Sequence, residues 1–295
     1  MNLYLIKWTI KERDENKKIK HFLHENLISR RTLKAIKFDG GHIHVNGKEI
    51  DVRYPLKVGD LLEVAFPPEI KSEKIQGEVI PMDIVYEDRD VLVVNKPAGM
   101  NTIPSREHPE GSLANAIIGY YERNQVHSTV HIVTRLDRQT SGLLLVAKHR
   151  HVHHLFSLQQ NDNIVKRRYE ALVEGKLENE QGSIIAPIGR KLSSIIEREV
   201  RNDGRYACTH YKVLGEYDEF SHLSLELETG RTHQIRVHLS HIGHPLLGDD
   251  LYGGKMDRIN RQALHCVQLS FYHPVCKKKM NFFCKLPEDI QQLQK

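Results

Sequence analysis

The chain has 295 residues, of which 39% are hydrophobic and 27% are charged, with a formal net charge of +5. These proportions are ordinary for a soluble globular protein, and the length predicts two domains. No apolar run approaches the roughly 18 residues that a membrane-spanning helix needs, and the N-terminal sequence does not fit a signal or transit peptide. We therefore expect a cytoplasmic protein without membrane attachment, and we expect its four cysteines, which lack CxxC spacing, to be free thiols.

Residues 13–75 are predicted to form a small α/β domain. Apolar residues recur at helical spacing over 17–27 and 30–38, and Ser29 is suited to cap the second helix. An Asn46-Gly47 pair between two strand-like runs is a strong signal for a β-hairpin. The pattern therefore indicates two helices packed on a small sheet.

The same region is strongly basic. Residues 16–37 contain seven lysines and arginines but only one acidic residue, Glu25. A solvated helix face is the default interpretation of such a run, but this density favours a polyanionic partner. The candidate phosphate contacts are Lys17, Lys20, Arg30, Arg31, Lys34 and Lys37.

A larger domain is predicted over 80–290, after a proline-containing and charged linker at 67–81. Helices are expected over 112–124, 149–160 and 231–243, between many strand-like runs. Because strands and helices do not alternate strictly, the pattern favours an α+β domain. Its sheet should be mixed and largely antiparallel rather than doubly wound and parallel.

One carboxylate in this domain, Asp137, lies between Arg135 and Arg138, directly before the apolar run 143–146. Such a carboxylate can act as a nucleophile or as a general acid or base. It can equally form a structural ion pair with the neighbouring arginines. Spacing alone favours the structural interpretation, because short motifs often match by chance.

The histidine-rich run 149–154 suggests metal ligands. A helix, however, would place His149 and His153 on one side and His151 and His154 on another, with no cysteine or carboxylate set nearby. We therefore expect no metal site in this run.

Six sequence blocks resemble, in order, those of the RluA/RluD-type pseudouridine synthases, over residues 80 to about 285. The blocks are NKPAGM (95–100), TRLDRQTSGLLLVAK (134–148), KRRYEALVEG (166–175), IAPIGR (185–190), LETGRTHQIRVHLSHIGHPLLGDDLYG (227–253) and RQALHCVQLSFYHP (261–274). Separately, residues 28–64 resemble an S4 RNA-binding domain, which many members of this family carry in front of the catalytic domain. The resemblance implies the pseudouridine synthase fold and RNA as the partner.

The resemblance also implies which residues form the site. Asp137 matches the essential aspartate of the family, Tyr169 the active-site tyrosine, and Arg236 the basic residue that pairs with the aspartate. Ile235 matches the apolar floor under the uracil, and Lys96 belongs to a motif expected to be structural. Thr134 departs from the family, which usually has histidine there. The expected substrate contacts are Thr134, Arg135 and Ile235.

The implied activity is the isomerisation of specific uridines to pseudouridine in structured RNA, with the target base flipped out and large-subunit ribosomal RNA as the expected substrate. No atoms or electrons are gained, so no cofactor is expected. Asp137 could attack C6 or C1′, or remove the 2′ proton. Arg236→Ala is expected to lose most activity without unfolding the protein, which should be a monomer.

Three alternatives remain open. Relatives in the family act on transfer RNA, so the substrate could be a transfer RNA. A catalytically inert RNA-binding or ribosome-assembly factor could also keep this fold, although it would not need Asp137, Tyr169 and Arg236 together. A glycoside hydrolase is the weakest alternative, because that chemistry ordinarily needs two carboxylates.

Overall fold

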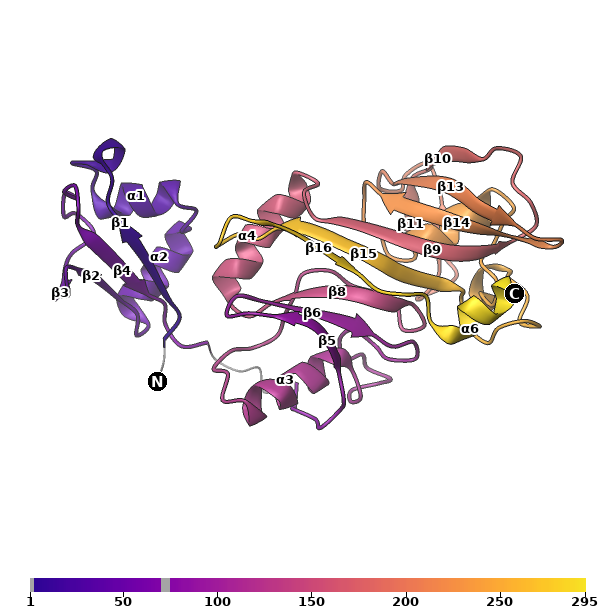
Figure 1. Ribbon diagram of the computed structural model, residues 1–295, viewed down its shortest axis with the longest axis horizontal. Helices are drawn as coiled ribbons and strands as arrows, with labels where there is room; N and C mark the ends of the chain where they lie inside the picture. The colour runs from indigo at the N-terminus through magenta and orange to yellow at the C-terminus, as the bar shows by residue number, and fades with distance from the viewer. Residues whose placement is uncertain (1–2, 70–74) are drawn as a thin grey trace.

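The computed structural model describes residues 3–69 and 75–295. Its N-terminal part is a small unit with its own sheet (Figure 1). Its elements are β1 (Leu5–Thr9), the 3-10 helix η1 (Glu12–Asp14), α1 (Ile19–Glu25), α2 (Arg30–Phe38), β2 (His42–Val45), β3 (Lys48–Glu49) and β4 (Leu61–Ala65). The four strands are antiparallel, in the order β1-β4-β2-β3. Because β1 pairs along β4, the unit begins before the predicted boundary at residue 13.

Local sequence signals account for the elements of this unit. The Ser29 hydroxyl accepts a hydrogen bond from the Thr32 N–H at 3.1 Å, which confirms the predicted cap of α2. Asn46 and Gly47 have φ angles of 50° and 78°, the left-handed pair that a tight hairpin turn requires, so the predicted hairpin is confirmed. Leu23, Ile36 and other apolar side chains of the helices are buried against the sheet in a separate core.

The larger unit contains a ten-stranded sheet. Its strands are β5 (Asp83–Glu87), β6 (Val91–Lys96), β7 (His131–Ile132), β8 (Ser141–Ala147), β9 (Lys166–Glu174), β10 (Gln181–Ile185), β13 (Cys208–Glu216), β14 (Phe220–Leu227), β15 (Leu264–Tyr272) and β16 (Lys279–Phe283). The main order is β10-β13-β14-β9-β15-β8-β6-β5, with β16 on β15 and β7 on β8. Among the described residues, only β8 and β15 pair in parallel. The predicted α+β class with a mixed, largely antiparallel sheet is confirmed.

The three predicted helices are present in the larger unit. The remaining elements are α3 (Leu113–Arg123), α4 (Arg150–Asn161), the hairpin of β11 (Ile188–Arg190) and β12 (Arg198–Val200), α5 (Gln234–His241), η2 (Asp250–Tyr252), α6 (Glu288–Gln291) and η3 (Gln292–Gln294). One extended core joins α3, α4 and α5 to the sheet. None of the helices in the described residues is long and apolar enough to cross a membrane.

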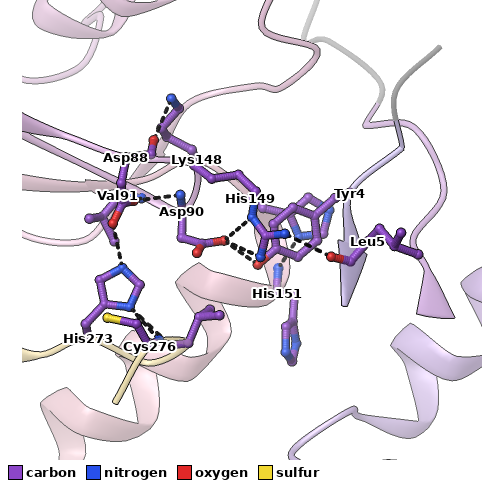
Figure 2. A network of polar contacts seen from close by, with 12 residues as sticks. Tyr4, Leu5, Asp88, Asp90, Val91, Lys148, His149, His151, His273 and Cys276 are labelled. Carbon is purple, nitrogen blue, oxygen red and sulfur yellow. Dashed lines mark hydrogen bonds and ion pairs between the residues drawn. The ribbon is translucent and has the colours of Figure 1, made fainter. Parts of the chain in front are cut away.

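The two units touch where the chain enters β1, as Figure 2 shows. The ring of Tyr4 stacks on His149 with centroids 4.1 Å apart, and its hydroxyl donates to Asp90 at 2.6 Å. Arg89 donates to the Leu5 carbonyl at 3.0 Å. Burial lowers the pKa of His149 to about 4, so the stacked ring is neutral. These contacts attach the N-terminal unit to the β5–β6 turn and to the start of α4.

Glu69, in the predicted linker, adds a second attachment. Its carboxylate accepts from the Arg150 N–H at the start of α4 and from His131, both at 2.6 Å. Although burial acts to raise the pKa of Glu69, these bonds hold it at about 2. The described linker residues, 67–69 and 75–81, form no helix or strand, and 70–74 lie outside the described residues.

Candidate active site

A cavity of about 540 Å³ lies between β9, the loop that precedes β8, and the loop that leads into α5. This volume suits a nucleoside-sized ligand. The predicted site residues come from three separate segments of the chain and all line this cavity. They are Thr134, Arg135, Asp137, Tyr169, Ile235 and Arg236.

Asp137 and Arg236 face each other in the cavity. Nη1 of Arg236 lies 3.6 Å from Oδ2 of Asp137, whose side chain is 29% exposed. The expected proximity of the two groups is therefore present. Because Asp137 is partly exposed while Arg236 is buried, the carboxylate is the member of the pair that a ligand can reach.

Arg236 has a closer partner that the sequence did not single out. Its Nε and Nη2 both donate to the carboxylate of Asp249 at 2.7 Å, and the Asp249 side chain is fully buried. Burial acts to lower the pKa of Arg236, but the carboxylates of Asp249 and Asp137 raise it above its usual value, so Arg236 is a permanent cation. Arg236→Ala would leave Asp249 buried without its partner, so we expect this variant to lower the stability of the fold as well as the activity.

The loop that carries Asp137 is held in place by a buried lysine and by its close approach to β15. Nζ of the buried Lys96 donates to the carbonyls of Met100 at 2.8 Å and Arg138 at 3.2 Å. At Gly142, φ is +116°, and a Cβ would lie only 2.4 Å from the Cys266 carbonyl oxygen. Glycine is therefore needed for β8 to approach β15 where the Asp137 loop ends.

Tyr169 enters the cavity from β9 and is 3% exposed. Its hydroxyl accepts a hydrogen bond from Nη1 of Arg167 at 3.1 Å. Burial raises the pKa of Tyr169 well above its usual value, so this side chain is a neutral phenol at physiological pH. In that form the hydroxyl can donate a hydrogen bond into the cavity.

The three expected substrate contacts differ in their surroundings. The Thr134 hydroxyl accepts from the Leu145 N–H at 2.9 Å, so it is already engaged with β8. Arg135 is exposed at the edge of the cavity, whereas Ile235 is buried and offers an apolar surface.

Several lining residues were not predicted. Arg167, Arg231 and His233 also line the cavity, whose four arginines outnumber its two carboxylates, Asp137 and Glu228. Such a lining attracts an anionic ligand. His233 and Asp249 lie inside a matched sequence block, but nothing in their spacing distinguishes them from turn residues.

The predicted phosphate contacts lie on the N-terminal unit. Arg30, Arg31, Lys34 and Lys37 are exposed along α2, and Lys20 is exposed on α1. Lys17 is half-buried and forms ion pairs with Asp14 at 3.0 Å and Glu25 at 2.5 Å, so its charge is already balanced. Arg31 and Lys34 also line a groove of about 430 Å³ between α2 and the start of α4.

The described residues contain two clusters of side chains that could ligate a metal. Each brings three metal-ligating atoms close together. One consists of Cys208, His210 and Glu228, and the other of Asp88, Asp90 and His273. Neither includes a histidine of the 149–154 run. All four cysteines are free thiols, as expected.

A family model described as RNA pseudouridylate synthase matches residues 90–241, just over half of the chain. The chain belongs to the RNA pseudouridylate synthase family. The matched segment of this synthase contains Asp137, Tyr169 and Arg236. The predicted enzyme class is therefore confirmed, while the roles of individual residues remain predictions.

Named relatives agree with this assignment. The uncharacterized RNA pseudouridine synthase YjbO of Bacillus subtilis is 52% identical over 277 residues, which are 94% of this chain and 98% of the relative. Ribosomal large subunit pseudouridine synthase D of Yersinia pestis is 38% identical over 268 residues, 85% of this chain and 81% of the relative. The solved structure of human RNA pseudouridylate synthase domain containing 1 aligns with a TM-score of 0.59 at 27% identity, covering 71% of this chain and 85% of the human chain.

Asp249→Asn should lower the free energy of unfolding by about 3–5 kcal/mol, because the substitution removes the buried countercharge that is hydrogen-bonded to the Arg236 guanidinium. Chemical denaturation followed by circular dichroism measures this difference. The matched control is Asp250→Asn, which changes the exposed neighbouring carboxylate and should alter the free energy of unfolding by only about 0.5 kcal/mol or less. Equal stability of the two variants would contradict the importance of the pair.

Proposed function

We propose that this synthase converts specific uridines of large-subunit ribosomal RNA to pseudouridine, with Asp137 as the reacting carboxylate. The observation that carries the proposal is the Asp137–Arg236 pair, 3.6 Å apart in a nucleoside-sized cavity of a pseudouridine synthase. The ribosomal substrate is supported by relatives named ribosomal large subunit pseudouridine synthase D. Transfer RNA is the second candidate substrate.

The reaction requires one carboxylate and a fixed positive charge beside it. The N1–C1′ bond of uridine breaks, the uracil turns, and a C5–C1′ bond forms; C5 then loses a proton and N1 gains one. Asp137 either adds to C6 or C1′ or removes the 2′ proton. Arg236, fixed by Asp249, stabilises the Asp137 carboxylate and the charge that develops beside it without reorganising.

The remaining lining residues would hold the flipped base. Ile235 offers an apolar floor, and the phenol of Tyr169 stacks on or donates to the uracil. Because Tyr169 is a neutral phenol, we propose that a water molecule held by its hydroxyl, rather than a phenolate, takes the C5 proton. Arg135 at the edge would contact a phosphate.

We propose that the N-terminal unit, residues 13–75 together with β1, is an S4 RNA-binding domain in front of a catalytic domain at 80–290. Its exposed cations on α2 would bind the RNA backbone independently of sequence. That binding would offset the few kcal/mol that base flipping costs. We propose a monomer that works in the cytoplasm, in keeping with the ribosomal RNA substrate.

The catalytic role of Asp137 is tested by release of the C5 hydrogen from RNA labelled with tritium at that position. Wild-type protein should release the label from transcribed large-subunit ribosomal RNA, and Asp137→Asn should release none while unfolding at the wild-type temperature. Asp250→Asn, a carboxylate outside the cavity, should behave as wild type. An active Asp137→Asn variant would refute the catalytic role of Asp137. If the wild-type protein released the label from transfer RNA alone, transfer RNA would replace ribosomal RNA as the proposed substrate.

The role of α2 is tested by the salt dependence of RNA binding. Arg30, Lys34 and Lys37 changed together to glutamine should reduce the slope of log affinity against log salt by about 2–3, because three phosphate contacts are lost. The control changes Lys176, Lys212 and Lys255, three exposed lysines of the larger unit, and should leave the slope near that of wild type. An unchanged slope for the α2 variant would place the RNA contacts elsewhere.

A further inference from the structure

A second side chain approaches the Asp137 carboxylate from the loop before α5. Nε2 of His233 lies 3.9 Å from Oδ2 of Asp137, the same oxygen that faces Arg236. Only 12% of the His233 side chain is exposed. A carboxylate with two cationic or donating groups at one oxygen is held in a defined orientation.

The backbone at His233 adopts an uncommon conformation. Its φ and ψ are 57° and 19°, in the left-handed region, where a residue other than glycine is strained by about 1–3 kcal/mol. The surrounding turn imposes this conformation through Gln234, whose side-chain oxygen accepts from the Thr229 hydroxyl at 2.8 Å and from the Arg231 N–H at 3.0 Å. Strain of this kind concentrates at functional sites, and here it turns the imidazole toward Asp137.

The hydrogen bonds of Tyr252 determine which nitrogen of His233 carries the proton. The Arg198 N–H can only donate, and it donates to the Tyr252 hydroxyl oxygen at 2.9 Å. The hydroxyl hydrogen is then directed at Nδ1 of His233, 2.8 Å away. This arrangement gives the hydroxyl hydrogen an acceptor in Nδ1, and in it a neutral His233 carries its own hydrogen on Nε2, the nitrogen that faces Asp137.

Burial is the main reason that His233 is neutral. Burial lowers the pKa of His233, and although Asp137 and Asp249 act to raise it, the cations Arg236 and Arg198 also lower it. At physiological pH the ring is therefore an uncharged donor. A distance of 3.9 Å exceeds that of a hydrogen bond, and such contacts commonly shorten when a substrate closes the site.

We propose that His233 is a positioning residue for Asp137, whose Nε2–H donates to Oδ2 in the RNA complex and leaves the other carboxylate oxygen to the uridine. Tyr252 is the residue that selects the required tautomer. This role rests on the proposed function of Asp137. It adds a histidine to a cavity that has Thr134 at the position where the family usually has histidine.

Two variants of His233 distinguish the effect of its N–H donor from the effect of the strained backbone. His233→Ala should lower kcat by about 100-fold with little change in KM, because a carboxylate misplaced by about 1 Å costs that much. His233→Gln keeps an N–H near the position of Nε2 and should recover most of this loss. Neither variant is glycine, so both carry the strain of the left-handed backbone, and their difference reports the donor. His241→Ala, on the exposed end of α5, is the control with wild-type kcat.

A spectroscopic measurement tests the tautomer without relying on activity. In wild-type protein at pH 7, ring nitrogen chemical shifts of His233 in ¹⁵N-labelled protein should show Nδ1 unprotonated and Nε2 protonated. Tyr252→Phe removes the hydroxyl and should give a mixture of tautomers. A cationic ring or an Nδ1–H tautomer in the wild type overturns the proposal, as does equal kcat for wild type and His233→Ala. If the wild-type protein modifies no RNA, the proposed function fails, and the nitrogen spectrum still decides the tautomer.

Discussion

The buried ion pair between Arg236 and Asp249 is the contact on which the site depends. A guanidinium buried in a protein core is tolerated only when its charge and its N–H groups are matched, and Asp249 does both through two hydrogen bonds. The pair links α5 to the segment that follows it, so the cation beside Asp137 is fixed before any ligand enters. A site arranged in this way stabilises developing charge without the cost of reorganisation.

The same fold connects the cavity to the N-terminal unit through α4. The start of α4 contacts Tyr4 and Glu69 at the junction, while Gln160 near its other end lines the cavity. A helix of 12 residues is about 18 Å long, so this distance separates the junction from the catalytic pocket. The groove beside α2 and the cavity therefore lie at opposite ends of α4.

Sequence patterns predicted the fold well because its signals are local. The cap at Ser29, the Asn46-Gly47 turn and the apolar periodicity of α3 to α5 each depend on residues a few positions apart. The pairing order of the larger sheet, and the contact of β1 with β4, depend on residues far apart in the chain, and no spacing rule specifies them.

The site was predictable only in part. Asp137, Tyr169 and Arg236 were singled out through resemblance to a family, since an aspartate between arginines is usually structural. Asp249, Tyr252 and His233 were missed, because their importance arises from contacts that the fold creates. Asp249 looks like a turn residue in the sequence, yet it is the closest partner of Arg236.

The most direct test of the central claim is a carbodiimide primer-extension map of pseudouridines in ribosomal and transfer RNA from cells with and without this gene. We predict that particular large-subunit ribosomal RNA signals disappear without the gene. They should return with the wild-type protein but not with Asp137→Ala. Full restoration by Asp137→Ala would contradict the claim that this carboxylate performs the isomerisation.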